Sequence, residues 1–374
     1  MKHSLMYTLI LLLSLAALSC DQTPLFYSIS KETPPKDPIV SGAPSRIVES
    51  NVSGSARLYV ANGKVWVYEG NSWTRMENQP NGYIREVAAT TATTSALYAL
   101  TVDGTDSLDT KLWKSLDGTS WTAVANETDY PTLGGIFGAG DTLFVGATDK
   151  NGSKAAVLYD DSGTLKSALS DIGIRDEVPG TLAGAVQMGG TYYLAITGMG
   201  IYTAATANGF NIDTPISGST DRTYNLNGLI ALSTEVVAVG SGGYMLRGDS
   251  NGFSEVSGAC DTSYPYTGAL AVWTDPDNAS NKLLLVGRRN GTYTNGYWEI
   301  PLSSGNLGTI SLNVPGSSSP TTAGDKDTYQ QALGQKVLTA LYQAQDSELG
   351  GILLASTLRD GLWACRGGVW NAEE

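Results

Sequence analysis

The sequence predicts an all-β fold, a β-propeller of seven blades in which each blade is a sheet of four antiparallel strands. A short apolar strand recurs at intervals of roughly 45 residues, which is the length of a propeller blade. A hairpin with an aromatic or large apolar residue in each arm follows most of these strands. The chain holds 44 glycines and 16% charged residues, a composition typical of short strands and tight turns. Rings of six or eight blades stay open as alternatives.

The clearest hairpins pair two tryptophans seven or eight residues apart. They are Trp66 with Trp73, Trp113 with Trp121, and Trp363 with Trp370. Less regular copies keep the spacing with Tyr202 and Phe210, Met245 and Phe253, and Leu158 and Leu165, whereas the unit around Tyr293 and Trp298 departs from it. A β-sandwich would not repeat such a spacing, and a β-solenoid would use shorter repeats. We therefore favour a propeller.

Each hairpin follows a strongly apolar strand, and a strand of small residues precedes most of these. The apolar strands are Leu58–Val60, Leu97–Leu100, Leu143–Val145, Tyr192–Ile196, Val236–Val239, Leu283–Val286 and Ile352–Ala355. The small-residue strands are Val87–Thr90, Gly134–Ala139, Leu182–Val186, Leu226–Leu232 and Ala269–Val272. Small residues fit the innermost strand of a blade, because the blades crowd together at the axis.

Two segments decide how the ring closes. Either Arg46–Val48 supplies a strand to the first blade, or the first and last blades pack without it. Residues 329–345 could form a short helix or a long inner strand, and we favour a strand over Val337–Tyr342.

The N-terminus predicts export. Lys2 precedes an apolar run, Leu5–Leu18, that is shorter than the roughly 20 residues of a membrane-spanning helix, so residues 1–19 are expected to be a cleaved signal. The run ends Ala17-Leu18-Ser19-Cys20, which resembles the relaxed lipobox of bacterial, spirochaete-like lipoproteins. That resemblance implies acylation of Cys20 and anchoring in the cell envelope, on the periplasmic face or the outer surface. An ordinary secretory signal is the alternative.

Three segments are therefore expected. Residues 1–19 are the signal, residues 20–50 are the lipidated cysteine with a proline-rich tether, and residues 51–374 are the propeller.

Composition excludes several functions. The net charge of −13 and the pI near 4.5 disfavour nucleic acid as a partner. The only histidine, His3, lies in the signal, which excludes Ser-His-Asp triads, Cys-His pairs and imidazole metal sites. Calcium sites at Asp275–Asn278 or at Asp103, Asp106 and Asp109 lack the full loop spacing, so we expect no metal or cofactor. Cys260 and Cys365 are expected to stay free thiols.

One hairpin carries a recognisable motif. The segment Ser115-Leu116-Asp117-Gly118-Thr119-Ser120-Trp121 resembles the Asp-box of BNR-type repeats, which occurs in sialidases, sortilin-like domains and photosystem assembly propellers. The resemblance implies a propeller in which the Asp117 carboxylate bonds turn amides and takes no part in catalysis. The Arg-Ile-Pro of sialidases is absent, and Tyr83-Ile84-Arg85-Glu86 is the nearest segment, so we do not expect a sialidase.

The loops that lead into the innermost strands share tyrosines. These candidate binding residues are Tyr83, Tyr130, Tyr224, Tyr264, Tyr266 and Tyr329, and four of the loops place Asp129, Asp221, Asp261 or Asp325 shortly before a tyrosine. Tyrosine offers a rigid apolar face with a polar tip, which suits binding to a protein or a glycan. In the alternative, each tyrosine caps its own blade. The sequence therefore predicts a membrane-anchored, non-catalytic binding or scaffold propeller; a histidine-free carbohydrate-active enzyme that uses carboxylates, or a purely structural envelope component, stays open.

Overall fold

The computed structural model describes residues 38–91, 95–103, 109–175, 178–179, 181–260, 265–289, 295–315, 322–324 and 326–373. Residues 37–374 form one compact unit. The predicted signal, Cys20 and Tyr264 lie outside the described residues.

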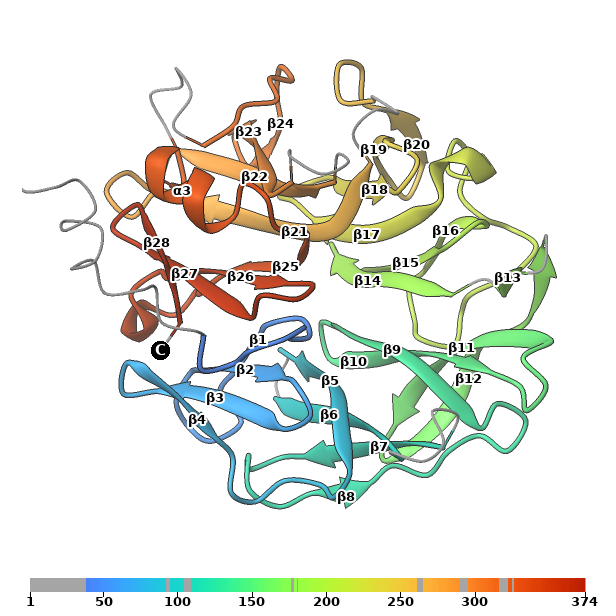
Figure 1. Cartoon of the computed structure of the whole chain (residues 1–374). Helices are drawn as coiled ribbons and strands as arrows, with labels where there is room; N and C mark the ends of the chain where they lie inside the picture. The colour runs from blue at the N-terminus through green and yellow to red at the C-terminus, as the bar shows by residue number, and fades with distance from the viewer. Residues whose placement is uncertain are drawn as a thin grey trace, which may run out of the picture. The chain divides into compact units, whose positions relative to one another are not determined.

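Within this unit, seven antiparallel sheets follow one another in chain order around a central axis (Figure 1). Blade 1 holds β1 Val48–Ser50, β2 Arg57–Ala61, β3 Val65–Glu69 and β4 Ser72–Arg75. Blade 2 holds β5 Tyr83–Thr90, β6 Ala96–Val102, β7 Thr110–Ser115 and β8 Thr122–Ala123. Blade 3 holds β9 Thr132–Ala139, β10 Thr142–Thr148, β11 Lys154–Asp161, β12 Thr164–Arg175 and β13 Val178–Pro179.

The other four blades complete the ring. Blade 4 holds β14 Leu182–Met188, β15 Thr191–Ile196 and β16 Gly200–Ala204. Blade 5 holds β17 Leu226–Ala231, β18 Val236–Gly240, β19 Met245–Asp249 and β20 Gly252–Glu255. Blade 6 holds β21 Tyr266–Thr274, β22 Lys282–Arg288, β23 Tyr297–Ser303 and β24 Asn306–Leu307. Blade 7 holds β25 Leu338–Gln343, β26 Leu353–Thr357, β27 Leu362–Arg366 and β28 Val369–Ala372.

The predicted seven-bladed propeller is confirmed. Each predicted apolar strand coincides with the second strand of a blade, and each predicted small-residue strand with the first, except that Ile352 and Leu232 lie one residue outside β26 and β17. In the described residues, blade 3 adds β13 at its outer edge and blade 4 has three strands. At that edge of blade 4, the Ile216 amide donates to the Ile201 carbonyl over 2.8 Å, so the chain after β16 covers part of the missing strand.

Glycines let the innermost strands approach one another across blade boundaries. A Cβ atom on Gly138 of β9 would lie 1.8 Å from the Ala89 carbonyl oxygen of β5, and one on Gly228 of β17 would lie 2.7 Å from the Gly268 Cα of β21. Neither position has room for a side chain. The small residues predicted for the inner strands are therefore required by the packing at the axis.

Bulky side chains fill the space between blades farther from the axis. Trp73 and Trp370, the second aromatic residues of their hairpins, are buried in the clusters between blades 7 and 1 and between blades 6 and 7. Their partners Trp66 and Trp363 are half-buried beside the same clusters. The paired aromatic residues thus hold neighbouring sheets together, which is why the pattern repeats blade by blade.

The ring closes between blades 1 and 7, and a strand that begins at Val48 takes part in the closure. Val48 begins β1, the innermost strand of blade 1, as the first alternative predicted. Before it, residues 38–46, the closure segment, run along blade 7: the Ile39 amide donates to the Glu373 carbonyl over 2.7 Å, and the Leu362 amide donates to the Val40 carbonyl over 3.0 Å. The described residues 38–50, which the sequence assigned to the tether, therefore pack against the ring.

Both readings of residues 329–345 hold in part. A short helix, α3 Lys326–Ala332, precedes β25, which covers most of the strand predicted over Val337–Tyr342. Both described cysteines are free, with Cys365 buried and Cys260 partly buried. None of the helices in the described residues has the length and apolar character needed to cross a membrane.

Candidate functional site

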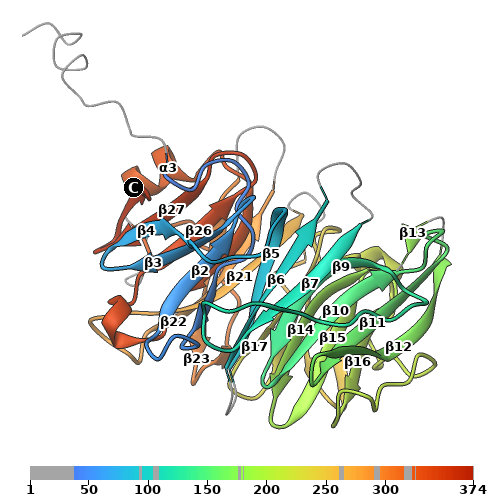
Figure 2. The ribbon, with the colours of Figure 1, turned by 90° about the horizontal axis from the view of Figure 1, so that it is seen from below.

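The antiparallel blades give the ring two faces (Figure 2). The loops that lead into each first strand, and those between second and third strands, lie on one face, which we call the loop face. The turns between first and second strands, and between third and fourth strands, lie on the opposite face, the hairpin face. This follows from the alternating direction of the strands.

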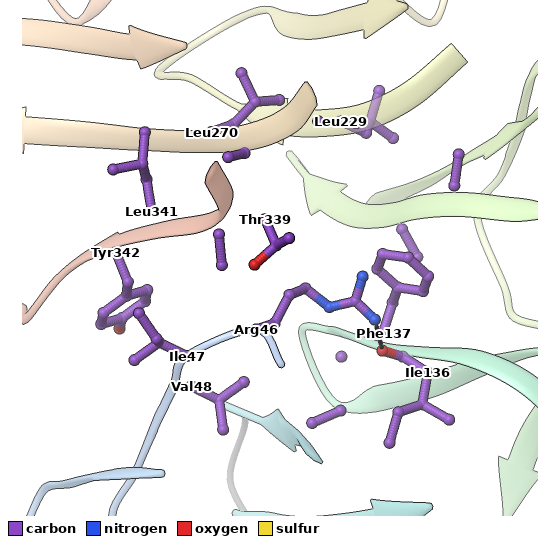
Figure 3. A pocket seen from close by; sticks show the side chains of 18 of the residues that line it. Arg46, Ile47, Val48, Ile136, Phe137, Leu229, Leu270, Thr339, Leu341 and Tyr342 are labelled. Atoms are coloured by element: carbon purple, nitrogen blue, oxygen red, sulfur yellow. Dashed lines mark hydrogen bonds between the residues drawn. The ribbon is translucent and has the colours of Figure 1, made fainter. Parts of the chain in front are cut away.

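A cavity of about 270 Å³ lies at the axis and is lined by the first strands of all seven blades (Figure 3). Arg46, from the closure segment, projects into it. Its Nη2 donates to the Glu86 carboxylate over 2.8 Å and to the Ile136 carbonyl over 2.7 Å, and its guanidinium lies 3.6 Å from the centre of the Phe137 ring. Burial lowers the pKa of Arg46 and Glu86 opposes that shift; the side chain stays protonated. Arg46 therefore ties three blades together at the centre.

Four of the predicted tyrosines are buried. Tyr130 accepts a hydrogen bond from the Asp171 amide over 3.0 Å, and Tyr224 donates to Glu255 over 3.1 Å. Burial, and then the Glu255 carboxylate, raise the pKa of Tyr224 to about 12. Each of these two tyrosines thus bonds within its own blade, which is the arrangement described by the alternative that each tyrosine caps its blade.

Of the other candidate tyrosines that the structure describes, two are buried and one is exposed. Tyr266 donates to the Ala259 carbonyl over 2.5 Å, and the Tyr329 hydroxyl accepts from the Tyr297 amide over 3.0 Å. Tyr83 is 52% exposed at the loop face. Ligand binding by the tyrosines stays a prediction, and among those described Tyr83 is the one with an exposed ring.

A second cavity, of about 450 Å³, opens at the loop face between blades 5, 6 and 7. We call it the rim pocket. It is lined by Asn227, Ser241, Pro265, Tyr266, Thr267, Arg289, Val337, Leu338, Thr339 and Leu358. It shares Asn227, Thr267 and Thr339 with the axial cavity, so the two are neighbours. Its volume lies in the range of ligand sites.

The rim pocket combines unpaired polar groups with an apolar rim. Arg289 is exposed and has no ion pair in the described part of the chain. The Asn227 Oδ1 and Thr267 Oγ1 atoms are buried without a hydrogen-bond partner among the described residues. Leu358 is 44% exposed. A few polar groups beside aliphatic surface suit recognition of another molecule.

Sequence reasoning did not single out the rim pocket. The one signal in the sequence is Arg288-Arg289, the only adjacent pair of Lys or Arg residues. Arg288 is buried, with its guanidinium 3.9 Å from the centre of the Trp298 ring, whereas Arg289 faces the pocket. Nothing in the linear sequence marks Leu358 as exposed.

A third cavity, of about 560 Å³, lies at the hairpin face and includes Asp275, Asp277 and Glu348 in its lining. Asp275 accepts from the Asp277 amide over 3.0 Å and from the Asn281 side chain over 3.2 Å, so the segment considered as a calcium loop is a self-bonded turn. No group of three metal-ligating side chains occurs among the described residues. Asp106, from the other candidate, lies outside them.

The Asp-box segment forms the turn that its resemblance implied. Asp117 Oδ1 accepts from the Thr119 and Ser120 amides over 2.7 and 2.6 Å, and Ser115 Oγ accepts from the Gly118 amide over 2.9 Å. These bonds lower the pKa of Asp117. Its carboxylate is engaged in the turn at the hairpin face, which fits a folding role.

Seven sheets around an axis, with cavities at the centre and the rim, define the protein as a β-propeller with ligand-sized openings. The chain belongs to the TP013X lipoprotein family, whose model matches residues 1–361. A search of curated proteins finds no match.

Solved structures share the fold at low identity. A GH74 enzyme of Niastella koreensis matches with a TM-score of 0.58 and 15% identity over 90% of this chain, which spans 55% of that enzyme. YCF48 bound to D1 peptide matches with a TM-score of 0.51 and 8% identity, over 92% of this chain and 96% of that one. The WD40 β-propeller domain of Doa1 matches with a TM-score of 0.51 and 11% identity, over 88% and 93% of the two chains. These similarities concern the fold alone.

Proposed function

We propose that this lipoprotein is a non-catalytic binding or scaffold propeller that engages a protein or a glycan through its loop face. The observation that carries the proposal is the rim pocket, where Arg289, which has no ion pair among the described residues, and the exposed Leu358 lie beside polar groups of three blades. The buried carboxyl with a raised pKa, Glu299, is 1% exposed and cannot reach a substrate. A carboxylate enzyme stays the second candidate, because the hairpin-face cavity is lined by Asp275, Asp277 and Glu348.

A propeller of similar fold supports the proposal by example. YCF48 was solved with a D1 peptide bound. A rigid ring with variable loops at one face is suited to such binding, because the scaffold positions the loops without moving itself.

We propose further that the protein is exported, cleaved before Cys20 and acylated there, on the basis of the lipobox-like segment and the family. More than one acyl chain is needed for stable anchoring. Mass spectrometry of the mature N-terminal peptide should find acylated Cys20, and Cys20→Ser should release the protein from membranes. An unmodified Cys20 would contradict the anchor. Protease treatment of intact cells then distinguishes the outer surface from the periplasmic face.

The loop-face proposal is tested with two matched variants of blade 7. Leu358 and Val369 are similarly exposed, at 44% and 41%, and lie beyond opposite ends of β27. Native membranes carrying the full-length protein are crosslinked, and co-purified proteins and glycans are quantified for wild type, Leu358→Asp and Val369→Asp. Molecules whose recovery falls about tenfold with Leu358→Asp alone support the proposal. Equal recovery from all three forms contradicts it.

A further inference from the structure

Cationic side chains surround the rim pocket. Arg289 follows β22. Arg359 lies just after β26 and Lys336 just before β25, and all three positions are on the loop face. Arg289 and Arg359 are exposed, and neither has an ion pair in the described part of the chain. Lys336 forms an ion pair with Asp360, with its Nζ atom 3.5 Å from Oδ2 of the carboxylate. The rim of this pocket is therefore basic in a protein whose net charge is −13.

The opposite face of the same two blades differs in charge. The opposite ends of blades 6 and 7 carry mainly acids: Asp275, Asp277, Asp346 and Glu348, with Lys282 and the ion-paired Arg366. On the loop face itself, the loops of blade 3 carry Glu127, Asp129 and Asp149 together with Lys150 and the ion-paired Lys154. The net charge of −13 disfavours acidic partners over the molecule as a whole, whereas the cations beside the rim pocket favour an acidic partner there.

The apolar part of the lining favours a protein segment over a sugar. Pro265, Leu338 and Leu358 offer aliphatic contacts. The one aromatic residue among the described lining, Tyr266, is 3% exposed, so the pocket offers no open ring face for stacking on a sugar. An unpaired guanidinium fits a carboxylate through two parallel hydrogen bonds.

We infer that the rim pocket binds an acidic segment of a protein partner, with a carboxylate of that segment paired to Arg289 and an aliphatic side chain against Leu358. This inference rests on the proposed loop-face function and names the chemistry of the partner. The cavity of about 450 Å³ accommodates a short stretch of such a segment rather than a folded domain.

The probes are three fluorescein-labelled decapeptides that each contain two leucines, with glutamate, glutamine or lysine elsewhere. Binding to the detergent-solubilised full-length lipoprotein is followed by fluorescence anisotropy. The glutamate peptide should bind at least about tenfold tighter than the other two, and added salt should weaken it, because the ion pairs are near the surface. Equal affinity for the glutamate and glutamine peptides, or no binding of the glutamate peptide, would overturn the inference.

Two charge reversals at opposite ends of β22 provide the matched control. Arg289→Glu should lower the affinity for the glutamate peptide about tenfold. Lys282→Glu, at the hairpin face of the same strand, should change that affinity less than about twofold. If Arg289→Glu has no effect, the inference is wrong. The proposed function is judged separately by the membrane recovery of Leu358→Asp, so it can stand when the acidic preference fails.

Discussion

Glu299 on β23 is a buried carboxyl group that is only partly satisfied. Its Oε1 atom accepts from the Ala323 amide over 2.7 Å and from the Thr322 hydroxyl over 3.1 Å. Its Oε2 atom has no partner among the described residues. Burial raises the pKa of Glu299 to about 7, and these two hydrogen bonds oppose the shift. Below about pH 7 the folded protein therefore favours the neutral acid.

The first prediction concerns stability and pH. In the folded protein the pKa of Glu299 lies above its ordinary value of 4.5. The contribution of Glu299 to the free energy of unfolding is therefore fully present below pH 4.5 and is lost as the pH rises through about 7. The loss is on the order of 3 kcal/mol. Glu299→Gln should flatten this dependence, so its free energy of unfolding relative to wild type should be higher at pH 8 than at pH 5. Urea unfolding at both pH values measures this, with Glu348→Gln, at an exposed site, as the control.

The candidate-site residues show what a sequence can and cannot predict at this scale. The Asp117 turn was predictable because its bonds join neighbours in the chain. The burial of Tyr266 and Tyr329 was not, since a tyrosine in a loop can face either way, and their partners are decided by packing. Arg289 and Leu358 meet only because the ring brings blades 6 and 7 side by side.

Among the elements, the hairpin turn at Asp117 depends on one carboxylate. Asp117→Ala removes the acceptor of the Thr119 and Ser120 amides. Those two amides should exchange with solvent faster, while the amides of β10 should keep their protection. Hydrogen-exchange mass spectrometry tests this, and Asp161→Ala, at the end of β11 in blade 3, is the control. Unchanged exchange at residues 119 and 120 would show that the carboxylate does not hold the turn.

The first strands depend on their glycines. Gly138→Ala would place a methyl group 1.8 Å from the Ala89 carbonyl of the neighbouring blade, so either blade must shift. We expect a loss of about 3 kcal/mol or more in the free energy of unfolding. Gly252→Ala, whose Cβ would meet its nearest atom at 3.6 Å, is the matched control and should change stability by less than about 1 kcal/mol. Equal effects would mean that the inner strands do not pack as described.

The elements themselves were largely predictable. Each second strand is a continuous apolar run because both faces of a blade are covered by its neighbours, and such a run is visible in the sequence. The exceptions are outer edges, such as the three-stranded blade 4, where residues 211–219 carry no strand pattern and are placed by contacts with β16.

At the scale of the whole molecule, the ring is held closed by contacts between its two ends. The Glu373 carboxylate accepts from Trp73 Nε1 of blade 1 over 2.8 Å and from Arg366 Nη2 of blade 7 over 2.9 Å. Its side chain is 3% exposed. Trp73 is separated from Arg366 and Glu373 by most of the chain, so their meeting could not be predicted from local patterns.

Removing this carboxylate should open the closure. Glu373→Ala leaves the Trp73 indole and Arg366 without their shared acceptor, which should cost about 2–4 kcal/mol of unfolding free energy. Amide exchange should increase in β4 and β28 before it increases elsewhere. Thermal unfolding and hydrogen exchange measure both effects, with the exposed Glu77→Ala as control. Destabilisation spread evenly over all blades would argue against a closure held at this point.

The central claim is that the loop face of the ring does the binding, and site-specific photocrosslinking in native membranes tests it most directly. A photoreactive phenylalanine replaces Leu358 in one full-length variant and Val369 in another, two similarly exposed sites at opposite ends of β27. The account predicts a discrete crosslinked partner from position 358 and none from position 369. The same partner from both positions, or a partner from position 369 alone, would contradict it.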